Sequence, residues 1–245
     1  MIVKPKVRGF ICTTAHPVGC EAVVRNEIEY VKSKRAEDSG FKPKKVLVIG
    51  SSMGYGLASR IALAFSAGAA TLGVMFDRPA SGNKTGTSGW YNTKAFEKFA
   101  QADGLYAKTV NGDAYSDECK KEVIDLIKSD LGKVDAVIYS LAAPRRTVGD
   151  VTYSSVLKTT GAPYTNKTID LRNNTVSEVT IEPATEEEIA ATVKVMGGED
   201  WAAWIDALKA ADAIEDNAVT VAYSYIGPEI THPMYFEGSI GRAKA

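Results

Sequence analysis

The sequence contains few of the residues that build disulfide frameworks and metal cages. Its 245 residues include three cysteines and two histidines, and no two cysteines have the C-x-x-C spacing. An odd cysteine count without that spacing argues against a disulfide framework and against a zinc cluster. Two histidines are too few for a transition-metal site built by the protein alone. We therefore expect no bound metal and a protein of a reducing compartment, the cytoplasm.

An excess of charge of one sign is missing as well. Lys and Arg total 29 against 30 Asp and Glu, a net charge of −1. This balance excludes a globally basic nucleic-acid binder, so we expect no nucleic-acid partner. The apolar stretches are strand-length or broken by Gly, Ser and charges, and the N-terminus is too polar for a signal peptide. We therefore expect neither a membrane span nor a secretory leader.

Short apolar runs alternate with amphipathic segments along most of the chain. Runs rich in β-branched residues predict buried strands over residues 45–50, 70–76, 105–110, 134–141 and 218–226. Apolar residues at helical spacing predict helices over residues 23–34, 57–67, 93–102, 117–131, 186–195 and 201–211, with another opening at 239–245. This alternation is typical of a parallel sheet with helices on both faces. The predicted fold class is α/β, a doubly wound, Rossmann-like parallel sheet of the short-chain-reductase kind.

Two segments interrupt this rhythm. Residues 145–184 are polar and Thr-rich, and a hairpin of strands 168–171 and 176–181 is expected within them. We interpret them as an inserted cover segment. Residues 1–44 form an N-terminal extension, and residues 35–45 a charged linker. The expected organisation is one dinucleotide-binding domain over residues 1–245.

A glycine-rich turn joins the strand predicted at 45–50 to the helix predicted at 57–67. Gly50, Gly54 and Gly56 give the spacing G-x-x-x-G-x-G. Glycine allows a tight turn and close backbone approach to a pyrophosphate, and the following helix N-terminus offers N–H groups and a positive dipole end. A tight turn that binds nothing is the alternative, but the strand–turn–helix context favours a dinucleotide.

Acidic residues follow the next two predicted strands. Asp77 ends the strand predicted at 70–76, where a carboxylate can accept hydrogen bonds from the adenosine ribose and repel the extra phosphate of NADP. This favours NADH, although Arg78 beside it could hold a 2′-phosphate, and a surface acid in a turn is the alternative. Asp113 could bond the adenine amino group, or it could be a turn residue before the helix at 117.

Two Tyr–Lys pairs are candidates for the proton donor. A Lys ammonium lowers the pKa of a nearby phenol, which then delivers a proton or stabilises an oxyanion. The Y-x-x-x-K pair Tyr30–Lys34 precedes the glycine turn, and we interpret it as a solvated helix face. Tyr235 and Lys244, at spacing Y-x8-K, follow the last predicted strand, which can place them at the carboxyl edge of the sheet, where ligands bind.

Several unusual strings appear in a recognisable order from residue 1 to 245. They are IVKP at 2–5, HPVGC at 16–20, GSSMGYGLA at 50–58, GWYN at 89–92, YSLAAP at 139–144, KVMGGEDW at 194–201 and AYSYIG at 222–227, followed by the pair Tyr235–Lys244. With these strings the chain resembles the trans-2-enoyl-CoA reductase family, which includes the FabV-type enoyl-acyl-carrier-protein reductases.

The resemblance implies NADH-dependent reduction of the α,β double bond of an enoyl-CoA or enoyl-acyl-carrier-protein thioester, in fatty acid biosynthesis. It implies that hydride goes to the β carbon and that Tyr235 helps to protonate the enolate that forms. It also implies that Lys244 holds the nicotinamide ribose and tunes the tyrosine, and that Tyr225 contacts the substrate carbonyl. Of Tyr223 and Tyr225, one is expected only to pack. The residues that would line NADH are Gly50, Ser51, Ser52, Met53, Gly54, Tyr55, Phe76, Asp77, Asp113, Ala114, Leu141, Ala142 and Lys244.

Chains of this family extend well past the Y-x8-K lysine, so we expect this sequence to be incomplete at its C-terminus. Residues 1–245 alone should then lack a closed active site and show little activity. We also expect a monomer. Two other hypotheses remain: a short-chain ketoreductase or alcohol dehydrogenase, which should carry Y-x-x-x-K after a Ser-bearing strand, and a non-catalytic dinucleotide-sensing regulator, which would not need Tyr235 or Lys244.

Overall fold

The computed structural model describes residues 2–8, 11–34 and 42–244. The linker expected at 35–45 therefore lies largely outside the described residues. The chain divides into two compact units, Met1–Leu141 with Trp204–Tyr223, and Ala142–Ala203 with Ser224–Ala245. A single domain was expected from the sequence; each unit is described by itself below.

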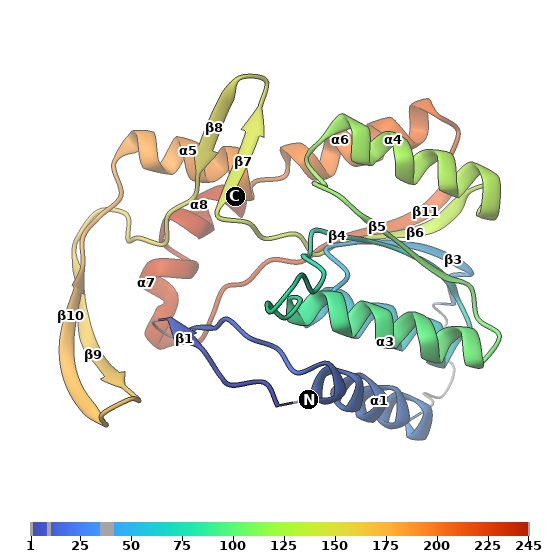
Figure 1. The fold of residues 1–245 in the computed structure, drawn as a ribbon. Helices are drawn as coiled ribbons and strands as arrows, with labels where there is room; N and C mark the ends of the chain where they lie inside the picture. The colour runs from blue at the N-terminus through green and yellow to red at the C-terminus, as the bar shows by residue number, and fades with distance from the viewer. Residues whose placement is uncertain (1, 9–10, 35–41, 245) are drawn as a thin grey trace. The chain divides into compact units, whose positions relative to one another are not determined.

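The first unit is built on a five-stranded parallel sheet (Figure 1). Its strands are β3 (Lys45–Ile49), β4 (Ala70–Met75), β5 (Ala107–Asn111), β6 (Val134–Tyr139) and β11 (Ile214–Ala222). The order β5-β4-β3-β6-β11 places the first strand in the middle, so the chain direction across the sheet reverses between β3 and β6. This is the doubly wound arrangement, and ligands bind outside the carboxyl ends of the strands at such a switch point. The predicted fold class is confirmed.

Helices lie on both faces of this sheet (Figure 1). They are α1 (Pro17–Ser33), α2 (Gly54–Ala67), α3 (Ser88–Ala102), α4 (Asp117–Leu126), which continues as a π-helix over Ile127–Leu131, and α6 (Glu199–Ala210), which begins in the other unit. A short hairpin of β1 (Val7–Arg8) and β2 (Ile11–Cys12) precedes them. Buried side chains of α1, α2, α3 and β5 form one apolar cluster, so α1 packs against α2 and α3.

The predicted boundaries of α1 and α3 were wrong in the same direction. Helix α1 begins at Pro17, six residues before the predicted start, because a proline at the first helical position is already in helical geometry and His16 Nδ1 accepts the Gly19 N–H. Helix α3 begins at Ser88 and not at residue 93. Its first turn contains Ser88 and Gly89, residue types that are common in loops.

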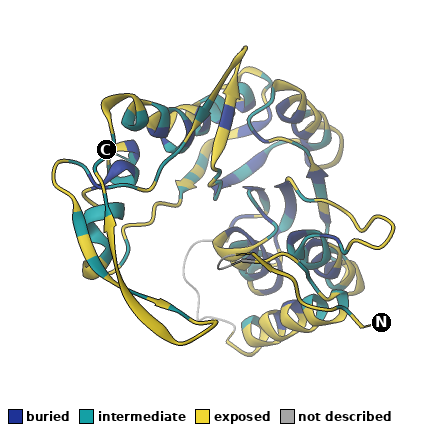
Figure 2. Cartoon of the chain, turned by 60° about the vertical axis from the view of Figure 1, so that its left-hand side comes forward, coloured by how far each residue is buried: buried dark blue, intermediate teal, exposed yellow. Residues whose placement is uncertain are grey.

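The strand predicted at 218–226 was only partly right. Strand β11 ends at Ala222, and it has one neighbour, β6, at the edge of the sheet. Val219 and Val221 are each 44% exposed, so β11 is not a buried strand. The central strands, by contrast, are buried: Val46, Leu47, Val48 and Ile49 have no exposed surface. Figure 2 shows the same contrast in colour.

Arg60 of α2 is a charged side chain inside this unit. It has no exposed surface, and its guanidinium donates to Thr71 Oγ1 at 3.1 Å, Thr109 Oγ1 at 2.8 Å and the Lys108 carbonyl at 2.6 Å. It lies over the Phe96 ring, 4.4 Å from the centroid. Burial lowers the pKa of Arg60 to about 10. A Cβ on Gly73 of β4 would overlap this guanidinium and Ser51 Oγ, so glycine is needed where α2 and the glycine turn meet β4.

The second unit contains two antiparallel hairpins and short helices. Strands β7 (Arg145–Val148) and β8 (Val151–Ser154) form a hairpin that the sequence did not predict. Strands β9 (Tyr164–Asp170) and β10 (Thr175–Ile181) form the predicted one, with a longer β9. They are followed by α5 (Glu186–Met196), whose N-terminus has a Thr185–Glu188 capping box. A 3-10 turn (Glu229–Thr231), α7 (His232–Tyr235) and α8 (Ser239–Lys244) complete the unit.

No helix among the described residues has the length and apolar character needed to cross a bilayer. Within those residues there is also no cluster of three or more His, Cys, Asp or Glu side chains that could hold a metal ion.

Candidate functional site

The glycine turn lies where β3 and β6 end beside each other. Gly50 has a φ of 80°, and a Cβ there would overlap the Ser140 carbonyl oxygen. A Cβ on Gly56 would overlap the Gly50 carbonyl oxygen. Residues with side chains do not fit at either position, so the turn brings bare backbone to the edge of the sheet. This is the cradle that a pyrophosphate requires.

Helix α2 begins directly after this turn with its first turn uncapped by any side chain of the described residues. Its N-cap residue, Met53, is extended, and Met53 and Tyr55 are more than half exposed. Ser51 fastens the turn to β4, since its N–H and its hydroxyl both donate to the Val74 carbonyl, at 2.9 and 3.1 Å. The N–H groups at the start of α2 thus remain for an anion, so the residues present fit a dinucleotide.

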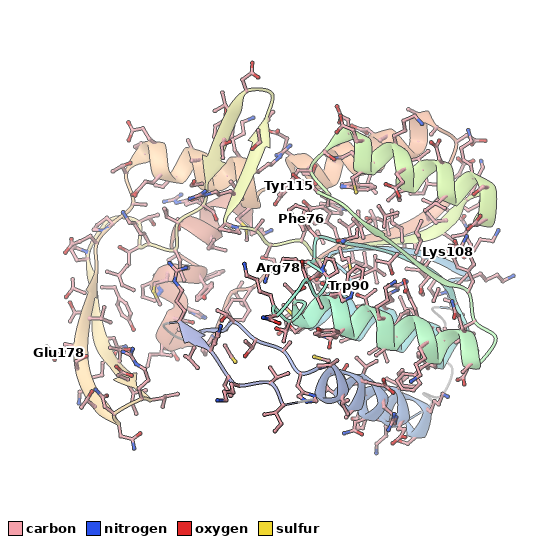
Figure 3. All side chains as sticks on the ribbon, viewed as in Figure 1. Phe76, Arg78, Trp90, Lys108, Tyr115 and Glu178 are labelled. Atoms are coloured by element: carbon pink, nitrogen blue, oxygen red, sulfur yellow. The ribbon has the colours of Figure 1, made fainter. Side chains whose placement is uncertain are left out.

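Asp77 lies just beyond the end of β4 and is held from two sides. Its Oδ1 accepts the Thr87 hydroxyl at 2.6 Å. Its backbone N–H donates to Asn111 Oδ1, and its carbonyl accepts from Asn111 Nδ2, both at 2.9 Å. Phe76, before it, is 79% exposed (Figure 3). The carboxylate is therefore fixed at the carboxyl edge of the sheet with acceptor capacity left over.

Asp113 and Ala114 follow β5 and have local roles in the structure. Asp113 Oδ1 accepts the Tyr115 N–H at 3.0 Å, which is the turn role that the sequence left open. The Ala114 carbonyl accepts from Trp204 Nε1 at 3.0 Å and from Lys120 Nζ at 3.1 Å, which ties α6 and α4 to this turn. Their contact with adenine remains a prediction.

The first unit gathers most of the predicted cofactor residues at one edge of its sheet. Leu141 follows β6, and its N–H nitrogen would be 3.2 Å from a Cβ on Gly50. The residues beyond the carboxyl ends of β3, β4, β5 and β6 are Gly50, Ser51, Ser52, Met53, Gly54, Tyr55, Phe76, Asp77, Asp113, Ala114 and Leu141. Ala142, Tyr225, Tyr235 and Lys244 belong to the second unit.

In the second unit, Tyr225 and Tyr235 lie together. Their ring centroids are 4.7 Å apart and the planes meet at 87°, an edge-to-face contact. Tyr235 is the last residue of α7, and Tyr225 is 47% exposed in the segment before it. The structure thus brings together the predicted proton donor and the predicted substrate-binding tyrosine.

Lys244 ends α8, close after α7 along the chain. Cβ atoms on Gly238 and Gly241 would overlap the carbonyls of Met234 and Phe236, so these glycines allow α8 to pack tightly on α7. Lys244 is half-buried, and burial lowers its pKa because the charged form is desolvated. In the described part of the chain its ammonium has no hydrogen-bond or ion-pair partner, so it can bind an external acceptor.

Sequence reasoning missed Asn111 and left Tyr223 open. A polar residue at the end of a predicted strand was the available signal for Asn111. Tyr223 packs against Tyr55 with centroids 5.7 Å apart, and its hydroxyl lies 2.6 Å from Ser59 Oγ. Tyr223 therefore packs against the start of α2, whereas Tyr225 contacts Tyr235; which of the two serves only for packing remains a prediction.

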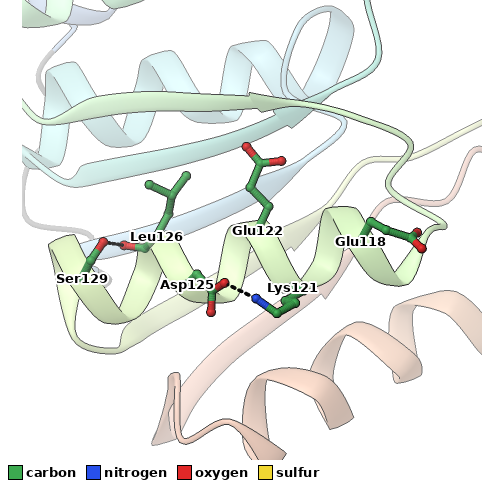
Figure 4. Close-up of a pocket in the computed structure, with 6 residues that line it drawn as sticks. All are labelled: Glu118, Lys121, Glu122, Asp125, Leu126 and Ser129. Atoms are coloured by element: carbon green, nitrogen blue, oxygen red, sulfur yellow. Dashed lines mark hydrogen bonds and ion pairs between the residues drawn. The ribbon is translucent and has the colours of Figure 1, made fainter.

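A hollow of about 560 Å³ lies along α4 and contains none of the predicted site residues (Figure 4). Its walls are Glu118, Lys121, Glu122, Asp125, Leu126 and Ser129, with Lys121 paired to Asp125 at 2.6 Å. Three of these six side chains are acidic and one is a lysine, and this net negative charge does not match a dinucleotide, whose phosphates it would repel.

Two family models match the chain. The one described as the NAD(P)H binding domain of trans-2-enoyl-CoA reductase matches residues 2–82. The one described as the trans-2-enoyl-CoA reductase catalytic region matches residues 84–245.

Individual relatives agree with these models. The chain is 60% identical to the trans-2-enoyl-CoA reductase (NADH) of Ruminiclostridium cellulolyticum and to the enoyl-acyl-carrier-protein reductase (NADH) of Opitutus terrae, in both cases over 100% of this chain and 62% of the relative. The crystal structure of Treponema denticola trans-2-enoyl-CoA reductase in complex with NAD superposes with a TM-score of 0.95 at 50% identity, over 99% of this chain and 62% of that one. The chain thus spans less than two thirds of the length of these relatives.

Proposed function

This chain belongs to the trans-2-enoyl-CoA reductase family, and on that basis we propose that the protein reduces the carbon–carbon double bond of trans-2-enoyl thioesters with NADH, in fatty acid biosynthesis. The substrate class is an enoyl-CoA or an enoyl-acyl-carrier-protein. The observation that carries the proposal is the glycine turn: neither Gly50, in the turn, nor Gly56, in the first turn of α2, has room for a Cβ, and the N-cap residue Met53 does not cap α2 with its side chain.

The cofactor assignment follows from the chemistry of the sheet edge. The backbone of residues 50–55 and the start of α2 would bind the pyrophosphate, Asp77 would accept hydrogen bonds from the adenosine ribose, and Phe76 would pack beside the adenine. Asp113, Ala114, Leu141 and Ala142 would line the rest of the dinucleotide. When bound, NADH supplies the hydride that the β carbon of the thioester accepts.

The tyrosines of the second unit would handle the charge that this transfer creates. Hydride addition at the β carbon places negative charge on the thioester oxygen, and Tyr225 would donate a hydrogen bond to that oxygen. Tyr235 would donate to the same enolate and help to protonate it. Lys244 would hold the nicotinamide ribose and assist Tyr235 in this proton transfer.

The test is an NADH-oxidation assay on the full-length gene product. We expect turnover of crotonyl-CoA and a kcat/KM lower by about a hundredfold or more for a 3-ketoacyl-CoA. Parallel assays with short and long enoyl-CoAs and with an enoyl-acyl-carrier-protein would define the natural thioester. Turnover of the ketone alone would favour the ketoreductase hypothesis, and NADH binding without turnover of any thioester would favour the sensor hypothesis.

The expected monomeric state and cytoplasmic location remain predictions. Light scattering of the purified protein and fractionation of the source cells would check them.

A further inference from the structure

The first turn of α3 touches both parts of the proposed cofactor site. Asn92 Nδ2 donates to the Ser52 carbonyl at 3.3 Å, and the Ser88 hydroxyl donates to Met53 Sδ at 2.9 Å, so this turn contacts the glycine turn. On its other side it contacts Asp77. The turn coincides with the string GWYN at 89–92, to which the proposed mechanism gives no role. Figure 3 marks Trp90 on this turn, together with Phe76 and Arg78 after β4.

Thr87 occupies the N-cap position of α3 but does not cap the helix with its side chain. Its hydroxyl donates to Asp77 Oδ1 at 2.6 Å and accepts the Arg78 N–H at 3.2 Å. Its own N–H donates to the Arg78 carbonyl at 3.0 Å. The hydroxyl of an N-cap threonine normally accepts a hydrogen bond from a backbone N–H of its own helix. The Thr87 hydroxyl instead donates to the Asp77 carboxylate.

Gly89 makes the space in which that carboxylate lies. A Cβ on Gly89 would overlap both carboxylate oxygens of Asp77. Gly89 is buried and helical, so no backbone strain requires glycine there. The Asp77 side chain therefore lies against the start of α3, close to the positive end of its dipole.

Resting on the proposed function, we propose that Thr87 and Gly89 are specificity-determining residues: they set the orientation of the Asp77 carboxylate and thereby the preference for NADH over NADPH. A carboxylate discriminates between NADH and NADPH only if it faces the adenosine ribose. In that position it accepts hydrogen bonds from the two ribose hydroxyls of NADH and repels the 2′-phosphate of NADPH. Thr87 uses one lone pair of Oδ1, which leaves the remaining acceptor positions for the ribose. Asn92 has a different role, since it supports the glycine turn that both dinucleotides share.

These roles predict different effects on the two dinucleotides. Thr87→Val keeps the shape but removes the hydroxyl, and we expect the NADH:NADPH affinity ratio to fall about fivefold. Thr87→Ser should restore the ratio. Gly89→Ala should reduce the ratio by about tenfold or more, because the carboxylate must move. Asn92→Ala should weaken both dinucleotides to a similar extent and leave the ratio unchanged.

The same helix offers a matched control. Thr93 has no exposed surface, and its hydroxyl has no hydrogen-bond partner in the described part of the chain. Thr93→Val therefore removes an equivalent hydroxyl six residues further on and should leave both affinities within about twofold.

The experiment is titration of the full-length protein and each variant with NADH and NADPH, followed by fluorescence, with melting temperatures recorded in parallel. A lowered ratio in Thr87→Val and its return in Thr87→Ser would support the proposal even if Gly89→Ala does not fold. If the wild-type protein prefers NADH and Thr87→Val has the same NADH:NADPH affinity ratio, the proposed role of Thr87 and Gly89 is overturned. The proposed function would then remain intact. Wild type that binds neither dinucleotide would overturn both.

Discussion

Tyr225 presents its ring edge-to-face with the ring of Tyr235, at a centroid separation of 4.7 Å. Such a contact is worth about 0.5–1.5 kcal/mol beyond the burial of the rings, and it limits the freedom of both phenols. Two tyrosines whose rings are in contact are candidates to donate to one developing oxyanion. The tyrosine pair is therefore the part of the second unit that substitutions should test first.

Replacing Tyr235 by Phe removes the hydroxyl and keeps the ring contact. We expect kcat with crotonyl-CoA to fall by about a hundredfold or more, because a general acid contributes that much or more, while the Kd for NADH changes little. Tyr225→Phe is the matched comparison, and we expect it to raise the KM for the thioester. Steady-state kinetics and NADH titration measure both. A Tyr235→Phe enzyme that retains half of the wild-type kcat would exclude Tyr235 as the proton donor.

Gly56→Ala tests the cradle for the pyrophosphate. The added methyl would overlap the Gly50 carbonyl oxygen, so we expect the Kd for NADH to rise by about tenfold or more even though alanine favours a helix. Gly68→Ala is the control: Gly68 ends the same helix with a φ of 72° and has open space around a Cβ. It should cost about 1–2 kcal/mol of unfolding free energy and leave the Kd unchanged. Equal NADH affinity in Gly56→Ala and wild type would contradict the cradle.

The lowered pKa of Lys244 predicts an alkaline limit to activity. Burial disfavours the ammonium, so the charge is lost as pH rises through a pKa below its usual 10.5. The proposed role requires the charged form, so kcat/KM for NADH should fall on the alkaline side. In Lys244→Arg the arginine side chain stays charged at every accessible pH. The kcat/KM for NADH of this variant should therefore not fall on the alkaline side. Lys244→Ala should weaken NADH binding and turnover together. The same alkaline fall in an active Lys244→Arg enzyme would assign it to another group.

Arg60→Ala should destabilise the first unit strongly. It leaves the Thr71 and Thr109 hydroxyls and the Lys108 carbonyl without their donor, and it opens a cavity beside Phe96. We expect the unfolding free energy to fall by about 3 kcal/mol in urea titrations. Arg25→Ala, which removes an exposed arginine paired with Glu21, should change it by less than about 1 kcal/mol. Similar losses in the two variants would contradict a structural role for Arg60.

The sequence predicts the parts of the fold that depend on local patterns. The run that became β3 is apolar and β-branched, and the glycines after it have few alternatives to a tight turn, so this strand, the turn and the helix after it follow from residues 45–68. The C-cap of α2 at Gly68 also depends on a local pattern, because its left-handed φ favours glycine.

The rest depends on contacts between distant residues. The start of α3 was predicted too late because glycine is common in loops. Glycine is needed at position 89 because a Cβ there would overlap the carboxylate of Asp77, which lies twelve positions earlier in the sequence. The burial of Arg60 depends on hydroxyls and carbonyls of β4 and β5 that local spacing does not reveal. The hairpin of β7 and β8 has short strands without an apolar face, so periodicity gave no signal.

Transfer of deuterium from NADH labelled at the nicotinamide C4 tests the central claim most directly. The full-length protein would be incubated with the labelled cofactor, in each C4 stereoisomer, and crotonyl-CoA, and the product analysed by mass spectrometry and NMR. We predict butyryl-CoA with one deuterium at the β carbon from one isomer and a solvent proton at the α carbon. A product without deuterium from either isomer, or with deuterium at the α carbon, would contradict the account.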